Sequence, residues 1–172
     1  MFEDCIFIDF DGVILDTETR LFERKHKAGF LDHDSEDEFY KYFEYTLAHP
    51  EEWDYIIREA DSLNNSVEII KELEKLKEKI VILTKIHTFY EMKVKIDDLR
   101  NHRHIESPVC FVPPGVEKHE VVIPRKQILI DDHFDNIERW VDNGGIGYLF
   151  DRDLLKNEKH KVKSLEFLID KR

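Results

Sequence analysis

The chain has 172 residues, 41% of them hydrophobic, which is enough for one sizeable core with at most a small appended subdomain. Its formal net charge is -12 and no basic cluster interrupts this acidity, so we exclude polynucleotide binding, but not a small anion neutralised by a metal and one lysine. No apolar stretch approaches the roughly 18 residues of a membrane span. Cys5 and Cys110 lie outside any metal-ligand spacing, and with no signal peptide in view we expect a cytoplasmic location.

The first predicted element is a buried strand over Cys5–Phe10, and two aspartates mark its end. Strand residues two apart face the same side, so Asp9 and Asp11 project together, and their oxygens suit a hard cation such as Mg2+. One such carboxylate can attack phosphorus while the other moves a proton. An EF-hand loop is excluded, because Val13 and Arg20 stand where ligand oxygens are needed. A plain strand-to-turn junction remains the alternative.

The next segment, 17–65, predicts helices only. A capping box at Ser35–Glu38 leads into a helix over Phe39–Leu47, and Pro50 begins another. Aromatic residues are concentrated here. An all-helical insert directly after the first strand predicts a small cap over the strand ends, where parallel sheets bind ligands.

Strands and helices alternate through the rest of the chain. The strands are Ile80–Thr84, Val109–Val112, Gln127–Ile130 and Ile146–Phe150; the helices are Ser66–Leu76 with Ser66 as N-cap, Thr88–Leu99, Phe134–Val141 and a short last one at Ser164–Ile169. The strands are apolar throughout, as strands covered on both faces should be. We therefore predict an α/β fold with a Rossmann-like parallel sheet and flanking helices, its core domain at 1–16 and 66–172 and its cap at 17–65.

Polar groups end two of the later strands. Thr84 closes one, and its hydroxyl and the following N–H groups can hold a phosphate oxygen, although a threonine that only closes a strand is the commoner case. Asp131 and Asp132 close another, and adjacent carboxylates call for a cation or a basic neighbour. The alternative for this pair is an N-cap of the following helix by Asp132 or Asp135.

One lysine is placed to serve these strand ends. Lys118 precedes the strand that ends in the two acids and can reach a phosphate as a point charge. Lys126 competes for that role, but it comes immediately before the strand, at the end opposite the acids. None of the nine histidines has a spacing that makes a zinc site, although His119 and His133 lie next to the expected site.

A family resemblance follows from the order of these features. The motifs on which the resemblance rests are Asp9-Phe-Asp11-Gly12-Val13, Ile82-Leu83-Thr84, Lys118 and Leu129-Ile130-Asp131-Asp132. It extends into Asn136-Ile137-Glu138-Arg139-Trp140 and Gly144-Gly145-Ile146. The chain resembles the haloacid dehalogenase-like (HAD) hydrolases, and within them the 5'(3')-deoxyribonucleotidase type with a small helical cap. The resemblance covers the sheet domain, whereas the cap is matched only in position and helical character.

The resemblance implies a Mg2+-dependent phosphomonoester hydrolase with an aspartyl-phosphate intermediate. Asp9 is then the nucleophile, and Asp11 protonates the leaving alcohol before it activates the hydrolytic water. The implied metal set is Asp9 through its carboxylate, Asp11 through its backbone carbonyl, and the pair Asp131 and Asp132. In the nucleotidase pattern Asp132 is the direct ligand, and Asp131 holds a metal-bound water or Lys118.

The same resemblance implies the substrate contacts. Thr84 and Lys118 bind the transferring phosphoryl oxygens, and Gly12 lets the backbone pass close to the phosphate. Lys85 stands where those nucleotidases carry a small residue, so it can bind a further acidic group of the substrate or point to solvent. The spacing from Lys118 to Asp131 is also longer than in those enzymes.

The expected partner is a small phosphorylated substrate, with a nucleoside monophosphate as one possibility, bound by a monomer or a homodimer. Four cap aromatics are candidates for stacking on a base, although aromatics at helical spacing are more often core: Phe22, Tyr40, Phe43 and Tyr45. A phosphatase for another small metabolite and a non-catalytic phosphate-binding module remain alternatives. A response-regulator receiver is disfavoured, because there the acid pair lies on the first strand and the phosphorylated aspartate on a later one.

Overall fold

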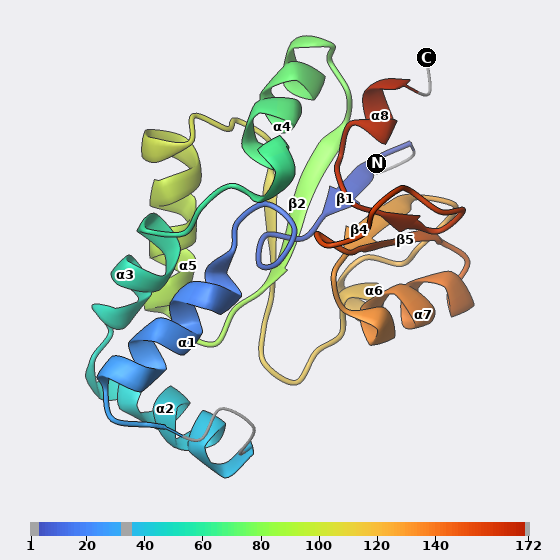
Figure 1. Cartoon of the computed structure of the whole chain (residues 1–172). Helices are drawn as coiled ribbons and strands as arrows, with labels where there is room; N and C mark the ends of the chain where they lie inside the picture. The colour runs from blue at the N-terminus through green and yellow to red at the C-terminus, as the bar shows by residue number, and fades with distance from the viewer. Residues whose placement is uncertain (1–3, 32–35, 171–172) are drawn as a thin grey trace.

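The computed structural model describes residues 4–31 and 36–170, so the predicted capping box at Ser35 lies outside the described residues. Its centre is one six-stranded sheet in the order β3-β2-β1-β4-β5-β6, in which every neighbouring pair is parallel. The strands are β1 (Ile6–Ile8), β2 (Ile80–Lys85), β3 (Val109–Val112), β4 (Ile128–Asp131), β5 (Ile146–Phe150) and β6 (Lys161–Val162). The predicted α/β parallel sheet is confirmed (Figure 1).

Helices connect and cover these strands. They are α1 (Thr17–Lys27), α2 (Glu36–Ala48), α3 (Glu52–Arg58), α4 (Ser66–Lys75), α5 (Phe89–Asp97), α6 (Lys118–Val121), α7 (Phe134–Asp142) and α8 (Phe167–Asp170), with short irregular turns at Leu63–Asn65 and Asp98–His102. Within the described part of the chain, none of these helices combines the length and apolar character of a membrane span.

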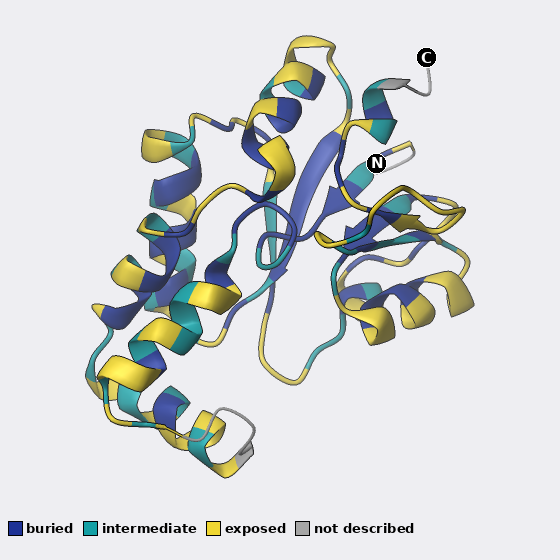
Figure 2. Ribbon diagram, viewed as in Figure 1, coloured by how far each residue is buried: buried dark blue, intermediate teal, exposed yellow. Residues whose placement is uncertain are grey.

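The sheet is covered on both faces because alternate residues of its strands point to opposite sides. On β1, Ile8 belongs to the large hydrophobic cluster that contains residues of α3, α4 and α5. Its neighbour Phe7 belongs to a second cluster, where its ring meets Trp140 of α7 edge-on at 5.4 Å between centroids. Figure 2 shows these central strands as buried. Burial on both faces explains the uninterrupted apolar character of the strands.

The first three helices lie together beyond the ends of β1 and β2, at the lower left of Figure 1. They do not have a core of their own. Tyr42 of α2 and Trp53 of α3 belong to the same hydrophobic cluster as Ile8 of β1 and Val94 of α5. This packing holds α1–α3 next to the edge of the sheet where β1 and β2 end.

Some predicted helix ends differ from the observed ones. Ser66 is the first residue of α4 rather than its N-cap, a position that Asn65 takes in the left-handed conformation at φ 62°. The Ser66 hydroxyl donates instead to the carbonyl of Val13, 2.8 Å away, and ties the helix to the loop after β1. Thr88 caps α5 through its side chain, and the last predicted helix begins later, at Phe167.

Candidate active site

Three carboxylates meet where β1 and β4 end. Asp9 follows β1, Asp131 ends β4 and Asp132 comes next, and one oxygen from each lies within 4.8 Å of the others. The two strands are adjacent and parallel, with Ile8 opposite Ile130, so their ends coincide. The sheet therefore places together acids that are more than 120 residues apart in the sequence.

Lys118 lies between two of these acids. Its Nζ is 2.8 Å from Asp9 Oδ2 and 2.6 Å from Asp131 Oδ2, and the side chain is buried. Burial opposes its charge, but Asp131 and Asp9 raise the pKa of Lys118 above its ordinary value, so the ammonium is retained. The lysine is placed there by the one-turn helix α6, which begins with it.

The two acids after β4 have different surroundings. Asp131 is saturated: Oδ1 accepts from the backbone N–H of His133 at 2.9 Å, and Asn136 Nδ2 lies 3.0 and 3.1 Å from its two oxygens. Asp132 Oδ1, by contrast, is one of three buried side-chain polar atoms that lack a hydrogen-bond partner within the described ranges. A buried oxygen without a partner is costly, and a cation would satisfy it.

The crowding of these carboxylates changes their acidity. The pKa of Asp9 is raised from 3.8 to about 8: burial is the largest cause, Lys118 opposes the rise, and the neighbouring acids add to it. Burial, followed by the negative charge of Asp131, raises the pKa of Asp132 from 3.8 to about 7. Carboxylates that resist ionisation beside one another favour a divalent cation between them. The donor set thus fits a hard divalent cation such as Mg2+, to which Asp9 and Asp132 would offer carboxylate oxygens.

Gly12 allows the chain to turn tightly beside Asp132. It has φ of +69°, and a Cβ at this position would collide with the Asp132 carboxylate. The Gly12 amide donates to the carbonyl of Leu15 at 2.9 Å, which closes the turn after Asp11. A glycine is therefore needed here for both the backbone angle and the space.

Asp11 is held by groups that the motifs did not point to. Its Oδ1 accepts from the hydroxyl of Thr17 of α1 at 2.8 Å, and its Oδ2 lies 2.6 Å from Nζ of Lys95 of α5. Thr84 Oγ1 is fully buried, 3.3 Å from Asp11 Oδ2 and 3.0 Å from Lys95 Nζ. The only sequence signal for Lys95 is Glu91 four residues earlier on the same helix, a spacing that is usual on solvated helix faces.

Lys85, half-exposed at the end of β2, does not lie free in the cavity. Its Nζ pairs with Glu117 Oε2 at 3.0 Å, and Glu117 also pairs with Arg139 of α7 at 2.5 Å. These ion pairs bridge β2, the loop before α6, and α7 along one wall of the site. A single carboxylate is thus shared by two cations along this wall.

A cavity of about 830 Å3 opens from the carboxylates toward α1–α3. Of the cap aromatics expected to stack, Phe22 and Phe43 line it, whereas Tyr40 and Tyr45 are not among its lining residues. Phe39 and Trp53 line it as well, and the ring of His87 lies 4.4 Å from that of Phe43. The cavity thus has a charged floor at Asp9 and Asp132 and an aromatic wall.

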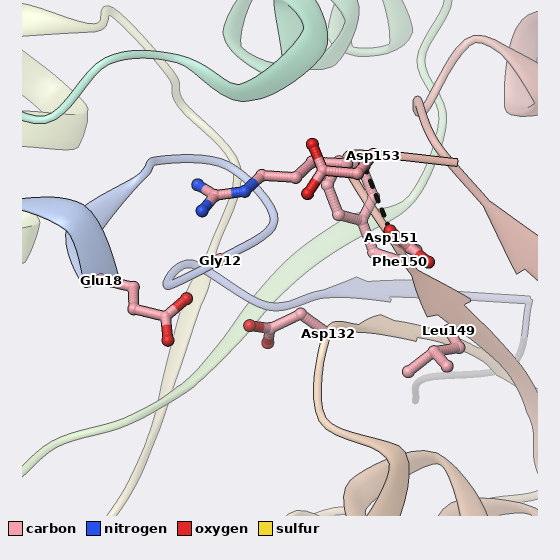
Figure 3. A pocket seen from close by; sticks show the side chains of 8 residues that line it. Gly12, Glu18, Asp132, Leu149, Phe150, Asp151 and Asp153 are labelled. Atoms are coloured by element: carbon pink, nitrogen blue, oxygen red, sulfur yellow. Dashed lines mark hydrogen bonds between the residues drawn. The ribbon is translucent and has the colours of Figure 1, made fainter. Parts of the chain in front are cut away.

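A second hollow of about 320 Å3 shares Gly12 and Asp132 with this site. In Figure 3, the Asp132 side chain points toward Glu18 of α1 across this pocket. Asp151 and Asp153, from the loop after β5, line the same pocket. Carboxylates outnumber cations around this hollow, as they also do around the larger cavity, so neither opening favours an anion by its charge alone.

The two histidines next to the expected site, His119 and His133, lie in different surroundings. His133 occupies the N-cap position of α7, with no side-chain cap, so the alternative in which Asp132 or Asp135 caps this helix is wrong. His133 lines the larger cavity, whereas His119 on α6 is half-buried and is not among the described lining residues.

Comparison with known proteins identifies the fold. No known family profile matches the sequence, and no curated relative is found. Three solved structures match it almost end to end: a HAD hydrolase, family IA, variant 3, of Entamoeba histolytica (13% identity, 97% of this chain and 98% of that one, TM-score 0.64); the protein YfnB of Bacillus subtilis, assigned as a HAD-hydrolase and solved with magnesium (13%, 96% and 96%, 0.64); and a Thermotoga maritima protein assigned as a β-phosphoglucomutase (17%, 97% and 97%, 0.60). Identities this low carry the architecture alone. With its six parallel strands, flanking helices and acidic strand ends, the chain has the HAD-like α/β fold.

Proposed function

We propose that this chain is a Mg2+-dependent phosphomonoester hydrolase that works through an aspartyl-phosphate. The observation that carries the proposal is the arrangement at the floor of the cavity. Asp9, a candidate nucleophile, is 2.8 Å from the buried ammonium of Lys118 and next to Asp132, whose Oδ1 has no partner among the described residues. A phosphoryl group needs these three things: a nucleophile, a fixed positive charge and a site for a cation.

Each residue then has a specific task. Asp9 attacks phosphorus, forming the Asp9–phosphorus bond as the bond to the leaving oxygen breaks, and Asp11 gives that oxygen its proton. In the second half, Asp11 takes a proton from water, which attacks the phosphorus and frees Asp9. The positive charge of Lys118 stabilises the phosphoryl oxygens, and the backbone N–H groups after Thr84 hold one of them in place, while the Thr84 hydroxyl donates to Asp11.

Asp9, the Asp11 carbonyl and Asp132 would hold Mg2+, and Asp131 keeps Lys118 in place rather than binding the metal directly. When bound, the metal supplies positive charge that favours the ionised form of Asp9 and neutralises the phosphoryl group. The saturated oxygens of Asp131 and the unpartnered Oδ1 of Asp132 support this division of labour.

We propose a nucleoside monophosphate as the substrate, in line with the resemblance to deoxyribonucleotidases. The aromatic wall of the cavity supports a flat leaving group, since stacking of a base on an aromatic ring contributes about 1–3 kcal/mol. Phe43 and Trp53 lie on the cavity side of the helices that cover it. We further propose that the chain acts in the cytoplasm as a monomer or homodimer; its two cysteines are free thiols.

The chemistry is tested by phosphate release from deoxyribonucleotides, ribonucleotides and sugar phosphates, with and without Mg2+. We expect Mg2+-dependent release that falls at least about a thousandfold in Asp9→Asn, because an amide cannot supply the nucleophile. Asp98→Asn is the matched control, since Asp98 is equally buried but lies on the turn after α5, paired with Arg103. Normal rates in Asp9→Asn contradict the mechanism; binding of phosphate esters without release from any of them indicates a binding module.

The substrate class is tested at the aromatic wall. Phe43→Ala should raise KM for a deoxyribonucleotide by about 5- to 150-fold, the stacking free energy of about 1–3 kcal/mol expressed as affinity, and leave KM for a small sugar phosphate nearly unchanged. Tyr40→Ala is the control, because Tyr40 lies on the same helix but is 67% exposed and outside the cavity. Equal effects of Phe43→Ala on both substrates, or faster turnover of sugar phosphates by the unaltered chain, would replace the nucleotide with another phosphorylated metabolite.

A further inference from the structure

A second buried ammonium, that of Lys95, lies beside the candidate active site. Lys95, on α5, has no exposed surface, and its Nζ contacts Asp11 Oδ2 at 2.6 Å, Thr84 Oγ1 at 3.0 Å and the Lys85 carbonyl at 2.9 Å. A lysine is rarely buried completely unless its charge is paired. These three contacts are all to groups at or beside the candidate active site, which indicates that this lysine serves the site rather than the core.

A helix turn fixes Lys95 in this position. Glu91 precedes it by four residues on α5, and Glu91 Oε1 lies 2.9 Å from Nζ. The other oxygen, Oε2, accepts from the backbone N–H of His87 at 2.6 Å and lies 3.2 Å from His87 Nδ1. The ammonium lowers the pKa of Glu91 to about 2 against the effect of burial. Lys95 is therefore clamped between one carboxylate on its own helix and one in the site.

The geometry separates Lys95 from the substrate. Asp11 and Glu91 line the larger cavity, but Lys95 is not among the described residues that do so. It lies on the inner side of Asp11, whose side chain is 42% exposed while that of Lys95 is 1% exposed. Lys95 therefore acts on the reaction only through the groups that it contacts, of which the Asp11 carboxylate is the one with a proposed catalytic task.

We propose that Lys95 is a positioning residue for Asp11, an inference that rests on the proposed phosphatase function. Lys95 and Thr84 hold Oδ2, and this fixes the plane of the carboxylate. Oδ1, which accepts only from the Thr17 hydroxyl within the described ranges, is then the oxygen that gives its proton to the leaving oxygen as the Asp9–phosphorus bond forms. Orientation of an acid within hydrogen-bond reach of the leaving oxygen is what general acid catalysis requires.

The test uses two leaving groups that differ in their need for a proton. Nitrophenolate leaves without protonation, whereas an alkoxide from an alkyl phosphate does not. In Lys95→Met, kcat/KM for an alkyl monophosphate should fall at least about 30-fold, within the usual contribution of general acid catalysis, and that for p-nitrophenyl phosphate less than about fivefold. The ratio kcat/KM reports the first phosphoryl transfer, so the later hydrolysis of the intermediate does not mask the difference.

Two further variants keep the result interpretable. Glu91→Gln leaves the lysine in place but weakens its clamp, and should show the same preference to a smaller degree even if Lys95→Met folds poorly. Lys25→Met is the matched control, because Lys25 is a buried lysine of α1 with 1% exposure, and it should affect both substrates equally. If Lys95→Met loses the same activity on both substrates, or loses none, the positioning role of Lys95 is overturned while the proposed phosphatase function stands. If the unaltered chain releases no more phosphate from either substrate than Asp9→Asn, the proposed function is overturned and this inference with it.

Discussion

At the residue scale, Gly12 is the position where backbone and site depend most directly on each other. Gly12→Ala adds a Cβ that collides with the Asp132 carboxylate and forces a side chain into a backbone at φ +69°. We expect the free energy of unfolding to fall by about 2–5 kcal/mol and Mg2+ binding to weaken, because Asp132 must move. Urea unfolding and calorimetric titration with Mg2+ measure the two effects.

Gly29→Ala is the control that separates the effect of backbone strain from the effect of a collision with a neighbouring side chain. It has φ of +93°, but a Cβ there would meet nothing within 4 Å. Gly29→Ala should therefore cost only the backbone strain, about 1–2 kcal/mol, and leave Mg2+ affinity unchanged. If the two alanine variants lose the same stability and bind Mg2+ equally well, Asp132 does not need the space beside Gly12.

The residues that the sequence predicted and those that it missed differ in a physical way. Asp9 and Asp132 come together because they follow the ends of the neighbouring parallel strands β1 and β4, and strand ends can be recognised from apolar runs. Lys95 and Thr17 reach the site from helices rather than from strand ends. A lysine at helical spacing from a glutamate looks the same in sequence whether it is solvated or buried, so only the packing of α5 distinguishes the two.

At the scale of elements, long buried strands were predictable and very short elements were not. Four of the five predicted strands agree with the structure to within one residue at each end, and the first runs longer than the observed β1 (Ile6–Ile8). The two-residue β6 and the one-turn α6 carry too few residues for any periodicity. Yet α6 begins with Lys118, so an element invisible in the sequence pattern positions one of the main charges of the site.

An ion pair between Arg24 and Glu52 links the helices over the cavity. Arg24 of α1 approaches Glu52 of α3 with two nitrogens at 2.6 and 2.8 Å, and Tyr42 of α2 donates to the same carboxylate at 3.1 Å. The guanidinium lowers the pKa of Glu52. Glu52→Gln should reduce the free energy of unfolding by about 2–4 kcal/mol, because it leaves a partly buried arginine without its counter-charge. Urea unfolding measures the loss.

An exposed ion pair provides the control for this prediction. Asp37 pairs with Lys41 on α2, and both side chains are mostly exposed. Asp37→Asn should leave the urea midpoint unchanged, because solvent screens such pairs. A loss in Asp37→Asn as large as that in Glu52→Gln would show that any charge change in these helices destabilises them, and the specific tie between α1, α2 and α3 would be rejected.

At the scale of the whole molecule, the acidic floor should couple Mg2+ binding to pH. Asp9 and Asp132 have pKa values raised from 3.8 to about 8 and about 7. Carboxyl groups with a raised pKa bind more protons in the folded than in the unfolded chain. Their contribution to stability is therefore neutral below pH 3.8, becomes steadily more unfavourable as pH rises toward about 8, and is then constant. Metal-free protein should lose this part of its stability over that window.

Mg2+ should reverse the trend, because it can bind only after displacing these protons. Between pH 8 and pH 6 the apparent Kd for Mg2+ should weaken by up to about tenfold per pH unit for each proton displaced. Calorimetric titration across this range, together with the rise in Tm on adding Mg2+, measures the effect. Asp98→Asn should leave the pH dependence of Mg2+ binding intact, since the pKa of Asp98 is also raised by burial but it lies apart from the site. Mg2+ binding that does not change between pH 6 and 8 would mean that Asp9 and Asp132 are already ionised without metal, or that Mg2+ binds elsewhere.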